Sequence, residues 1–177
     1  MTPVPSSPPA RRSRRSGTVR HSAARLAAVQ ALYQIEITGA MAGTVIEEFV
    51  EHRLGSADIE ASRGAKANEA LFSQLVRGTG IRGAEIDERL APLLAPGWSV
   101  ERIDVILRNI LRLGAFELLA RPEVPATVVI KEYVDLADAF FSGDEPGVVN
   151  AILDRLARAL RPGELESRHD RPGRPTG

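Results

Sequence analysis

Arginine side chains dominate the start of this sequence, and arginine is the side chain best suited to binding phosphate groups. A guanidinium donates paired hydrogen bonds to phosphate oxygens and keeps its charge at physiological pH. No acidic residue occurs before Glu36, so residues 1–35 carry a charge of +6. The other 142 residues hold 17 basic and 23 acidic side chains and carry −6. The arginines are Arg11, Arg12, Arg14, Arg15, Arg20 and Arg25.

This charge asymmetry favours a polyanionic partner, although the whole chain has zero net charge. Gln30 and Tyr33 follow the arginines and supply an amide for base edges and a ring for stacking on unpaired bases. Two alternatives stay open. The charged run could be a solvated tail, and Tyr33 could be partly buried in the core, since it shares an apolar helical stripe with Leu26, Val29 and Ile37.

No pattern in the sequence indicates catalysis. The stretch GTGIRG, residues 78–83, matches a dinucleotide-binding fingerprint, but a helical pattern precedes it where that fingerprint requires a strand. We interpret it as a glycine-rich break between helices. The three histidines lie in different segments, and the chain has no cysteine for a thiolate nucleophile or ligand. We therefore expect no catalytic residue, no cofactor and no metal site.

The apolar pattern that must position these residues is helical throughout. Gly39 is expected to end the first helix, Thr44 to open a capping box with Glu47, and Ser99 to cap the most apolar helix. Low aromatic content also favours an aliphatic helical core. We predict an all-α fold of about seven helices over residues 22–38, 44–55, 66–78, 84–94, 100–121, 125–141 and 143–160.

The two ends of the chain are rich in Pro, Ser, Gly and Arg. Residues 1–19, an arginine-rich arm, and residues 162–177 are expected to be disordered because they contain too few large apolar side chains to offset the entropy of ordering. Between them we expect one helical domain over residues 20–161, with sub-bundles at about 20–80 and 81–161. Neither a membrane-spanning run nor a signal peptide is apparent, which favours a cytoplasmic protein.

Two blocks of the sequence resemble the NusB family of bacterial transcription antitermination factors. The first is ARLAAVQALYQ, residues 24–34, which is similar to the first helix of that family. The second covers residues 107–157, where AFELL, EVPATVVIKEYVDLA and VVNAILD occur in the family's order and spacing. The similarity extends over roughly residues 20–160.

The resemblance implies a fold of two packed helical sub-bundles with no catalytic activity and no cofactor. It implies binding of boxA-type single-stranded RNA as a heterodimer with NusE, a small-subunit ribosomal protein, in an antitermination complex with RNA polymerase that supports ribosomal RNA transcription. Arg20, Arg25, Gln30 and Tyr33 would then belong to the RNA surface. The loop at Asp144 and Val148 would face RNA and NusE.

Two other functions remain open from the sequence. Bundles that resemble this family also form the N-terminal domain of some RNA cytosine methyltransferases, so the chain could be a fragment of such an enzyme. It could also be a helical oligomerisation module with an incidental arginine tail, since homodimers occur among family members.

Overall fold

The computed structural model describes residues 10–55 and 66–166, and every regular element within those ranges is a helix. In chain order the elements are α1 (Ala10–Thr38), α2 (Ala42–Glu48), the π-helical segment η1 (Phe49–Arg53), α4 (Glu69–Ile81), α5 (Gly83–Leu90), the short 3₁₀ turn η2 (Ala91–Leu93), α6 (Val105–Ala120), α7 (Ala126–Phe140) and α8 (Glu145–Leu160). The prediction of an all-α fold with about seven helices is confirmed.

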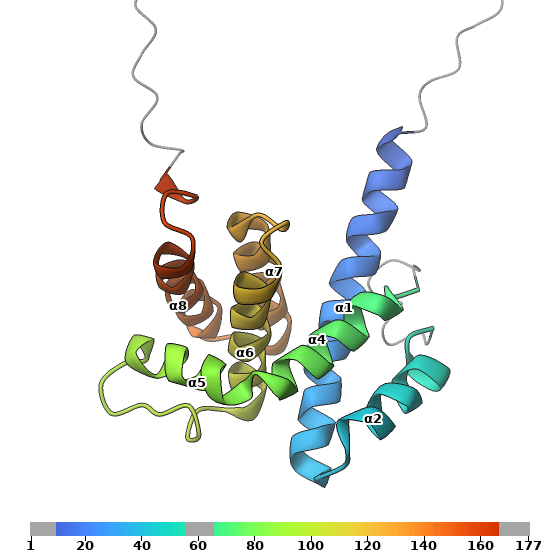
Figure 1. Ribbon diagram of the computed structural model, residues 1–177, viewed down its shortest axis with the longest axis horizontal. Helices are drawn as coiled ribbons and strands as arrows, with labels where there is room; N and C mark the ends of the chain where they lie inside the picture. The colour runs from blue at the N-terminus through green and yellow to red at the C-terminus, as the bar shows by residue number, and fades with distance from the viewer. Residues whose placement is uncertain (1–9, 56–65, 167–177) are drawn as a thin grey trace, which may run out of the picture.

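The helices form two packed groups, as the sequence predicted. In the first group α1 packs against α2 and α4, and in the second α6 packs against α5, α7 and α8. Figure 1 shows α1 and α2 on one side of the molecule and α6, α7 and α8 on the other. Helices α1 and α4 both contact α6, so α6 joins the two groups.

The helix ends differ from the prediction at two positions. Helix α2 begins at Ala42 with Met41 at its N-cap, so Thr44 lies inside the first turn and caps nothing. Asp104, rather than Ser99, caps α6: its carboxylate accepts hydrogen bonds from the backbone N–H groups of Ile106 at 2.8 Å and Leu107 at 3.1 Å. Asp is among the best N-cap residues, and here it lies directly before the apolar helix.

The structure describes two stretches that we assigned to the disordered ends, residues 10–19 as helix and residues 162–166 mostly as turns. Residues 10–19 form the first turns of α1, in keeping with the high helix propensity of Arg and Ala. After α8, Glu164 accepts a hydrogen bond from the backbone N–H of Ala126 at 2.6 Å. Arg161 donates to the backbone oxygens of Leu118 at 2.9 Å and Val124 at 2.7 Å. Residues 1–9 and 167–177 lie outside the described residues.

The buried face of α1 follows only part of the apolar stripe that the sequence shows. Val29 of that stripe is buried, whereas Tyr33 is 41% exposed and Ile37 is 61% exposed. Besides Val29 and Leu32, the buried face is formed by small side chains, all with no exposed surface: Ala23, Ala24, Ala27, Ala28 and Ala31. Small residues allow helix axes to approach closely, which leaves the bulky side chains at the edge of the contact.

Two helical glycines make room for side chains of neighbouring helices. A Cβ atom at Gly78, in α4, would overlap the ring of Phe116 in α6. At Gly114, in α6, it would lie 2.7 Å from a methyl carbon of Leu153 in α8. The GTGIRG stretch thus spans the last turn of α4 and the start of α5, and the first of its glycines serves helix packing. This geometry agrees with its interpretation as a break between helices.

Candidate nucleic-acid interface

A groove of about 730 Å³ runs along the outer face of α1. We call it the α1 groove. Its walls come from the C-terminal half of α1, from η1, from the first turn of α6 and from the end of α7. The lining residues are Val29, Gln30, Tyr33, Gln34, Ile37, Thr38, His52, Arg53, Ile106 and Phe140.

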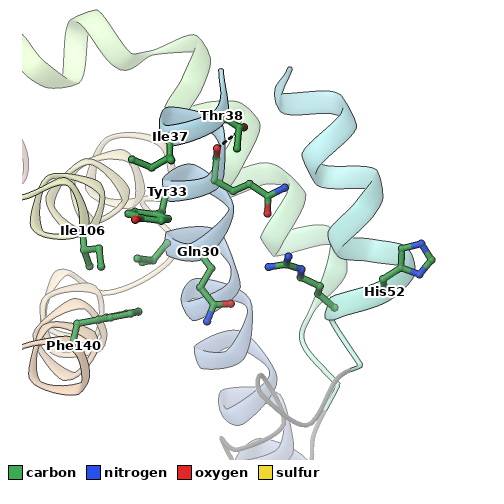
Figure 2. Close-up of a pocket in the computed structure, with 10 residues that line it drawn as sticks. Gln30, Tyr33, Ile37, Thr38, His52, Ile106 and Phe140 are labelled. Atoms are coloured by element: carbon green, nitrogen blue, oxygen red, sulfur yellow. Dashed lines mark hydrogen bonds between the residues drawn. The ribbon is translucent and has the colours of Figure 1, made fainter. Parts of the chain in front are cut away.

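Two of the residues predicted to bind RNA meet in this groove. Gln30 is half-buried, and Tyr33, one helical turn further along, leaves 41% of its surface open to solvent. Figure 2 shows Tyr33 and Ile37 on the side of α1 that faces Ile106 and Phe140, whereas His52 comes from the opposite side. A half-exposed ring beside an amide can stack on a base and bond to its edge. Tyr33 is thus partly buried and partly open to solvent.

A second groove, of about 780 Å³, holds the two predicted residues of the loop that opens α8. We call it the α8 groove. Asp144 is exposed at the N-cap of α8, and Val148 is half-buried one turn later. Trp98, which is 49% exposed, faces the same groove from the loop before α6.

The first turn of α6 contributes to both grooves. Ile106 lines the α1 groove, whereas Leu107, the next residue, lines the α8 groove. The two groups of predicted residues therefore flank one helix end, although they are more than 100 positions apart in the sequence. Sequence reasoning missed Trp98 and Phe140. The only signal for Trp98 was a tryptophan in the LAPGWS break, and Phe140 looked like an ordinary helix-end residue.

Arg20 lies outside both grooves, on the exposed side of α1. Its Nε donates a hydrogen bond to the backbone oxygen of Lys66 at 3.1 Å, and its own backbone oxygen accepts from Asn68 at 2.9 Å. Arg20 precedes Gln30 by ten residues, or about 15 Å along the helix. A single strand that follows α1 could therefore reach both residues.

Arg25 is not available to a ligand in this structure, because only 4% of it is exposed. It forms a two-pronged ion pair with the fully buried Glu117 of α6, with Nε–Oε2 and Nη2–Oε1 distances of 2.6 and 2.9 Å. Its remaining nitrogen lies 3.2 Å from Glu132 of α7. Tyr133 and Arg121 also donate to Glu117, at 2.7 and 2.9 Å. The geometry of Arg25 does not fit the predicted RNA contact.

This buried cluster alters the proton affinity of its members. Burial alone would raise the pKa of Glu117, but the hydrogen bonds and charges of Arg25, Tyr133 and Arg121 outweigh it and lower that pKa below its usual value. Burial, reinforced by the negative charge of Glu117, raises the pKa of Tyr133 well above its usual value. Partial burial and the positive charges of Arg25 and Arg121 lower the pKa of His21.

Neither a metal site nor a membrane span is found in the part of the chain that the structure describes. Within residues 10–55 and 66–166, no three His, Asp or Glu side chains gather into a group that could hold a metal ion. Over the same ranges, no helix combines the length and the apolar character needed to cross a bilayer.

Comparison with known proteins decides the family. The model of the NusB family matches residues 22–158. The transcription antitermination protein NusB of Maricaulis maris (strain MCS10) is 52% identical over 143 residues, which are 81% of this chain and 89% of that protein. The chain belongs to the NusB family. Its relatives are named for transcription antitermination, and that name describes a regulatory factor rather than an enzyme.

Solved structures of family members share the fold. NusB of T. maritima matches with a TM-score of 0.65 and 28% identity, over 82% of this chain and 96% of that one. A second match is the crystal structure of the antitermination factors NusB and NusE in complex with double-stranded RNA, with a TM-score of 0.59 and 23% identity over 78% of this chain and 96% of that one. At that identity the second match supports the fold alone.

Proposed function

We propose that this protein is a transcription antitermination factor that binds boxA-type single-stranded RNA together with NusE, within a complex that contains RNA polymerase. The RNA-binding activity belongs to the helical domain of residues 20–161. A role of this kind places the protein with RNA polymerase in the cytoplasm and concerns above all the transcription of ribosomal RNA.

The observation that carries this proposal is the α1 groove. It presents a half-exposed Tyr33 next to Gln30, on the helix where the family match begins. An open apolar groove with one aromatic ring and one amide suits unstacked bases, which proteins recognise by stacking and by hydrogen bonds to base edges. The proposal of NusE as a partner rests on membership of the NusB family.

Arg20 and the arginines of the first turns of α1 supply the charge that a nucleic acid requires. In Figure 1 the first turns of α1 extend beyond the other helices. We assign phosphate binding to Arg20 and base recognition to Gln30 and Tyr33. Asp144 and Val148, in the α8 groove, are assigned to the surface that NusE and RNA share.

The test is a titration of fluorescein-labelled boxA RNA, followed by anisotropy at several salt concentrations. The protein alone is expected to bind weakly and with a marked salt dependence, and NusE is expected to tighten binding. Arg20→Ala should make the salt slope shallower by about 0.7, the value for one phosphate contact to a single strand. Binding that is equally tight to a scrambled RNA, with or without NusE, would refute the proposal.

The matched control is Arg77→Ala. Arg77 is an exposed arginine of α4 that lies outside both grooves, beside Ile81. Its removal changes the total charge as Arg20→Ala does, but it should leave the affinity and the salt slope nearly unchanged. An equal loss in the two variants would mean that only net charge matters and that the assignment of Arg20 is wrong.

A further inference from the structure

Small side chains make up most of the contact surface of α1 at its centre, where Val29 is the one large apolar residue between Ala23 and Ala31 that is fully buried. All five alanines from Ala23 to Ala31 are fully buried, and α1 contacts both α4 and α6. Packed helices normally hold their rotation and axial position by fitting ridges of side chains into grooves of the neighbour. Methyl groups form low ridges, so an alanine surface resists sliding or rotation of the helix less than a surface of large side chains would.

The cluster around Arg25 supplies the directional contacts that the alanines lack. A bidentate pair between a guanidinium and a carboxylate has two fixed distances and one plane, so it tolerates little rotation of either helix. Arg25 makes this pair with Glu117 of α6, while Ser22, one turn earlier, donates to Glu132 of α7 at 2.7 Å. Helix α1 is thus bonded to two helices within a single turn.

We propose that Arg25 and Glu117 are positioning residues, which fix the rotation and axial position of α1 and so hold Gln30 and Tyr33 in the α1 groove. This inference rests on the proposed RNA-binding function. A slip of α1 by one residue would rotate it by about 100° and move it by about 1.5 Å. Tyr33 would then turn away from Ile106 and Phe140, which form the opposite wall of the groove. In this role Arg25 does not contact RNA.

A fully apolar replacement separates positioning from stability. The triple variant Arg25→Met, Glu117→Leu and Tyr133→Phe removes the pair together with the hydroxyl that depends on it. Replacing a buried ion pair by apolar side chains of similar size is often neutral or stabilising. We therefore expect cooperative unfolding with a Tm no more than about 5 °C below that of the parent. Affinity for the boxA RNA should fall about tenfold or more, the loss of one base stack, and the salt slope should not change.

The position of α1 can be measured without RNA. The sequence has no cysteine, so Ile37→Cys and Asp138→Cys, at two exposed sites on α1 and α7, give one specific pair of spin labels. The distance distribution between the labels should be narrow in the parent and broader or shifted in the triple variant. An unchanged distribution would overturn the inference. So would a salt slope shallower by about 0.7, which is the mark of a lost phosphate contact.

Glu117→Gln is a second variant that changes the shape of the cluster very little. If the triple variant does not fold, Glu117→Gln tests whether Arg25 positions α1 or contacts RNA. The positioning role predicts a broader label distribution and weaker RNA binding. A direct contact between Arg25 and RNA predicts equal or tighter binding, because a negative charge has been removed, and that result would refute positioning. Failure of the proposed function would look different, because the parent protein itself would then show no preference for boxA RNA. The label distances would still show whether Arg25 and Glu117 fix the position of α1.

Discussion

A surface helix usually turns its large apolar side chains to the interior and its polar ones to solvent. Helix α1 departs from this arrangement on both faces. The face turned to the interior consists mainly of alanines, with Val29, Leu32 and one charged residue, Arg25, whereas Tyr33 and Ile37 stay exposed at its edge. Size and charge, rather than polarity alone, decide which side is buried. Small side chains let α1 approach α4 and α6 closely, and a buried arginine is tolerated because Glu117 neutralises it.

The contrast indicates that the two faces have different tasks. An exposed tyrosine and isoleucine add nothing to the core, and exposed apolar side chains that line a groove are typical of binding surfaces. The buried face sets where the helix lies, and the exposed face meets the partner. Substitutions on the buried face should therefore act mainly on the free energy of unfolding, and substitutions on the exposed face mainly on RNA binding.

The largest effect on stability is expected from Arg25→Met alone. This change leaves the carboxylate of Glu117 buried without its main partner, and breaking a buried pair in this way costs about 3–5 kcal/mol. Because Arg121 and Tyr133 still donate to Glu117, the loss should lie near the lower end of that range. Urea unfolding followed by circular dichroism measures it. A loss below about 1 kcal/mol would show that the pair contributes little to stability.

A smaller loss is expected from Ala27→Leu. Ala27 has no exposed surface, so three additional carbon atoms must push α1 away from its neighbours, and such overpacking costs about 1–3 kcal/mol. The matched control is Ile37→Leu on the exposed face of the same helix, which should change the unfolding free energy by less than about 0.5 kcal/mol. Equal effects at the two positions would contradict the division of α1 into a packing face and a binding face.

The buried cluster around Glu117 should also make the free energy of unfolding depend on pH, with a smaller effect than that of the two substitutions above. The pKa of Glu117 is lower in the folded state, so its stabilising effect is complete above the usual carboxyl pKa of about 4.3 and is lost as the pH falls through the lower folded value. The pKa of Tyr133 is raised, so stability should also decline as the pH rises above about 10. Unfolding curves from pH 2 to 11 test both limbs, and Glu117→Gln should flatten the acid limb.

The smallest effect on stability is expected from Tyr33→Ala, which should nevertheless weaken RNA binding most clearly. With much of its ring exposed, Tyr33 should contribute less than about 0.5 kcal/mol to folding. Loss of one stacked base costs about 1–3 kcal/mol of binding energy. Tyr33→Phe keeps the ring and should keep most of the affinity. Anisotropy titrations compare the three proteins, and Ile81→Ala, at an 85% exposed residue outside both grooves, is the control.

Much of the fold was predictable because most of its helices bury large apolar side chains. In α8, Val149, Ile152, Leu153 and Leu156 follow the helical period, and all four are buried. Helix α1 departs from this pattern, because periodicity marks the inner face only where the large residues lie inside. The identity of its buried face depends on how closely α4 and α6 approach, which no local pattern records.

The candidate site was predictable only in part for a related reason. Gln30 and Tyr33 could be found from their side chains, and the structure brings both into one groove. The burial of Arg25 could not be found, because its partner Glu117 lies 92 positions away and looks like an ordinary charged residue of α6. The contribution of Trp98 to the α8 groove depends likewise on a loop that runs back to α8.

The contact between Gly78 and Phe116 has a consequence for how this sequence can diverge. The ring of Phe116 occupies the space that any side chain at position 78 would need, so position 78 must stay glycine as long as Phe116 is present and α4 and α6 keep their separation. A side chain at position 78 becomes acceptable only after position 116 has become smaller. Among related chains, these two positions should therefore be substituted together, with the change at 116 coming first.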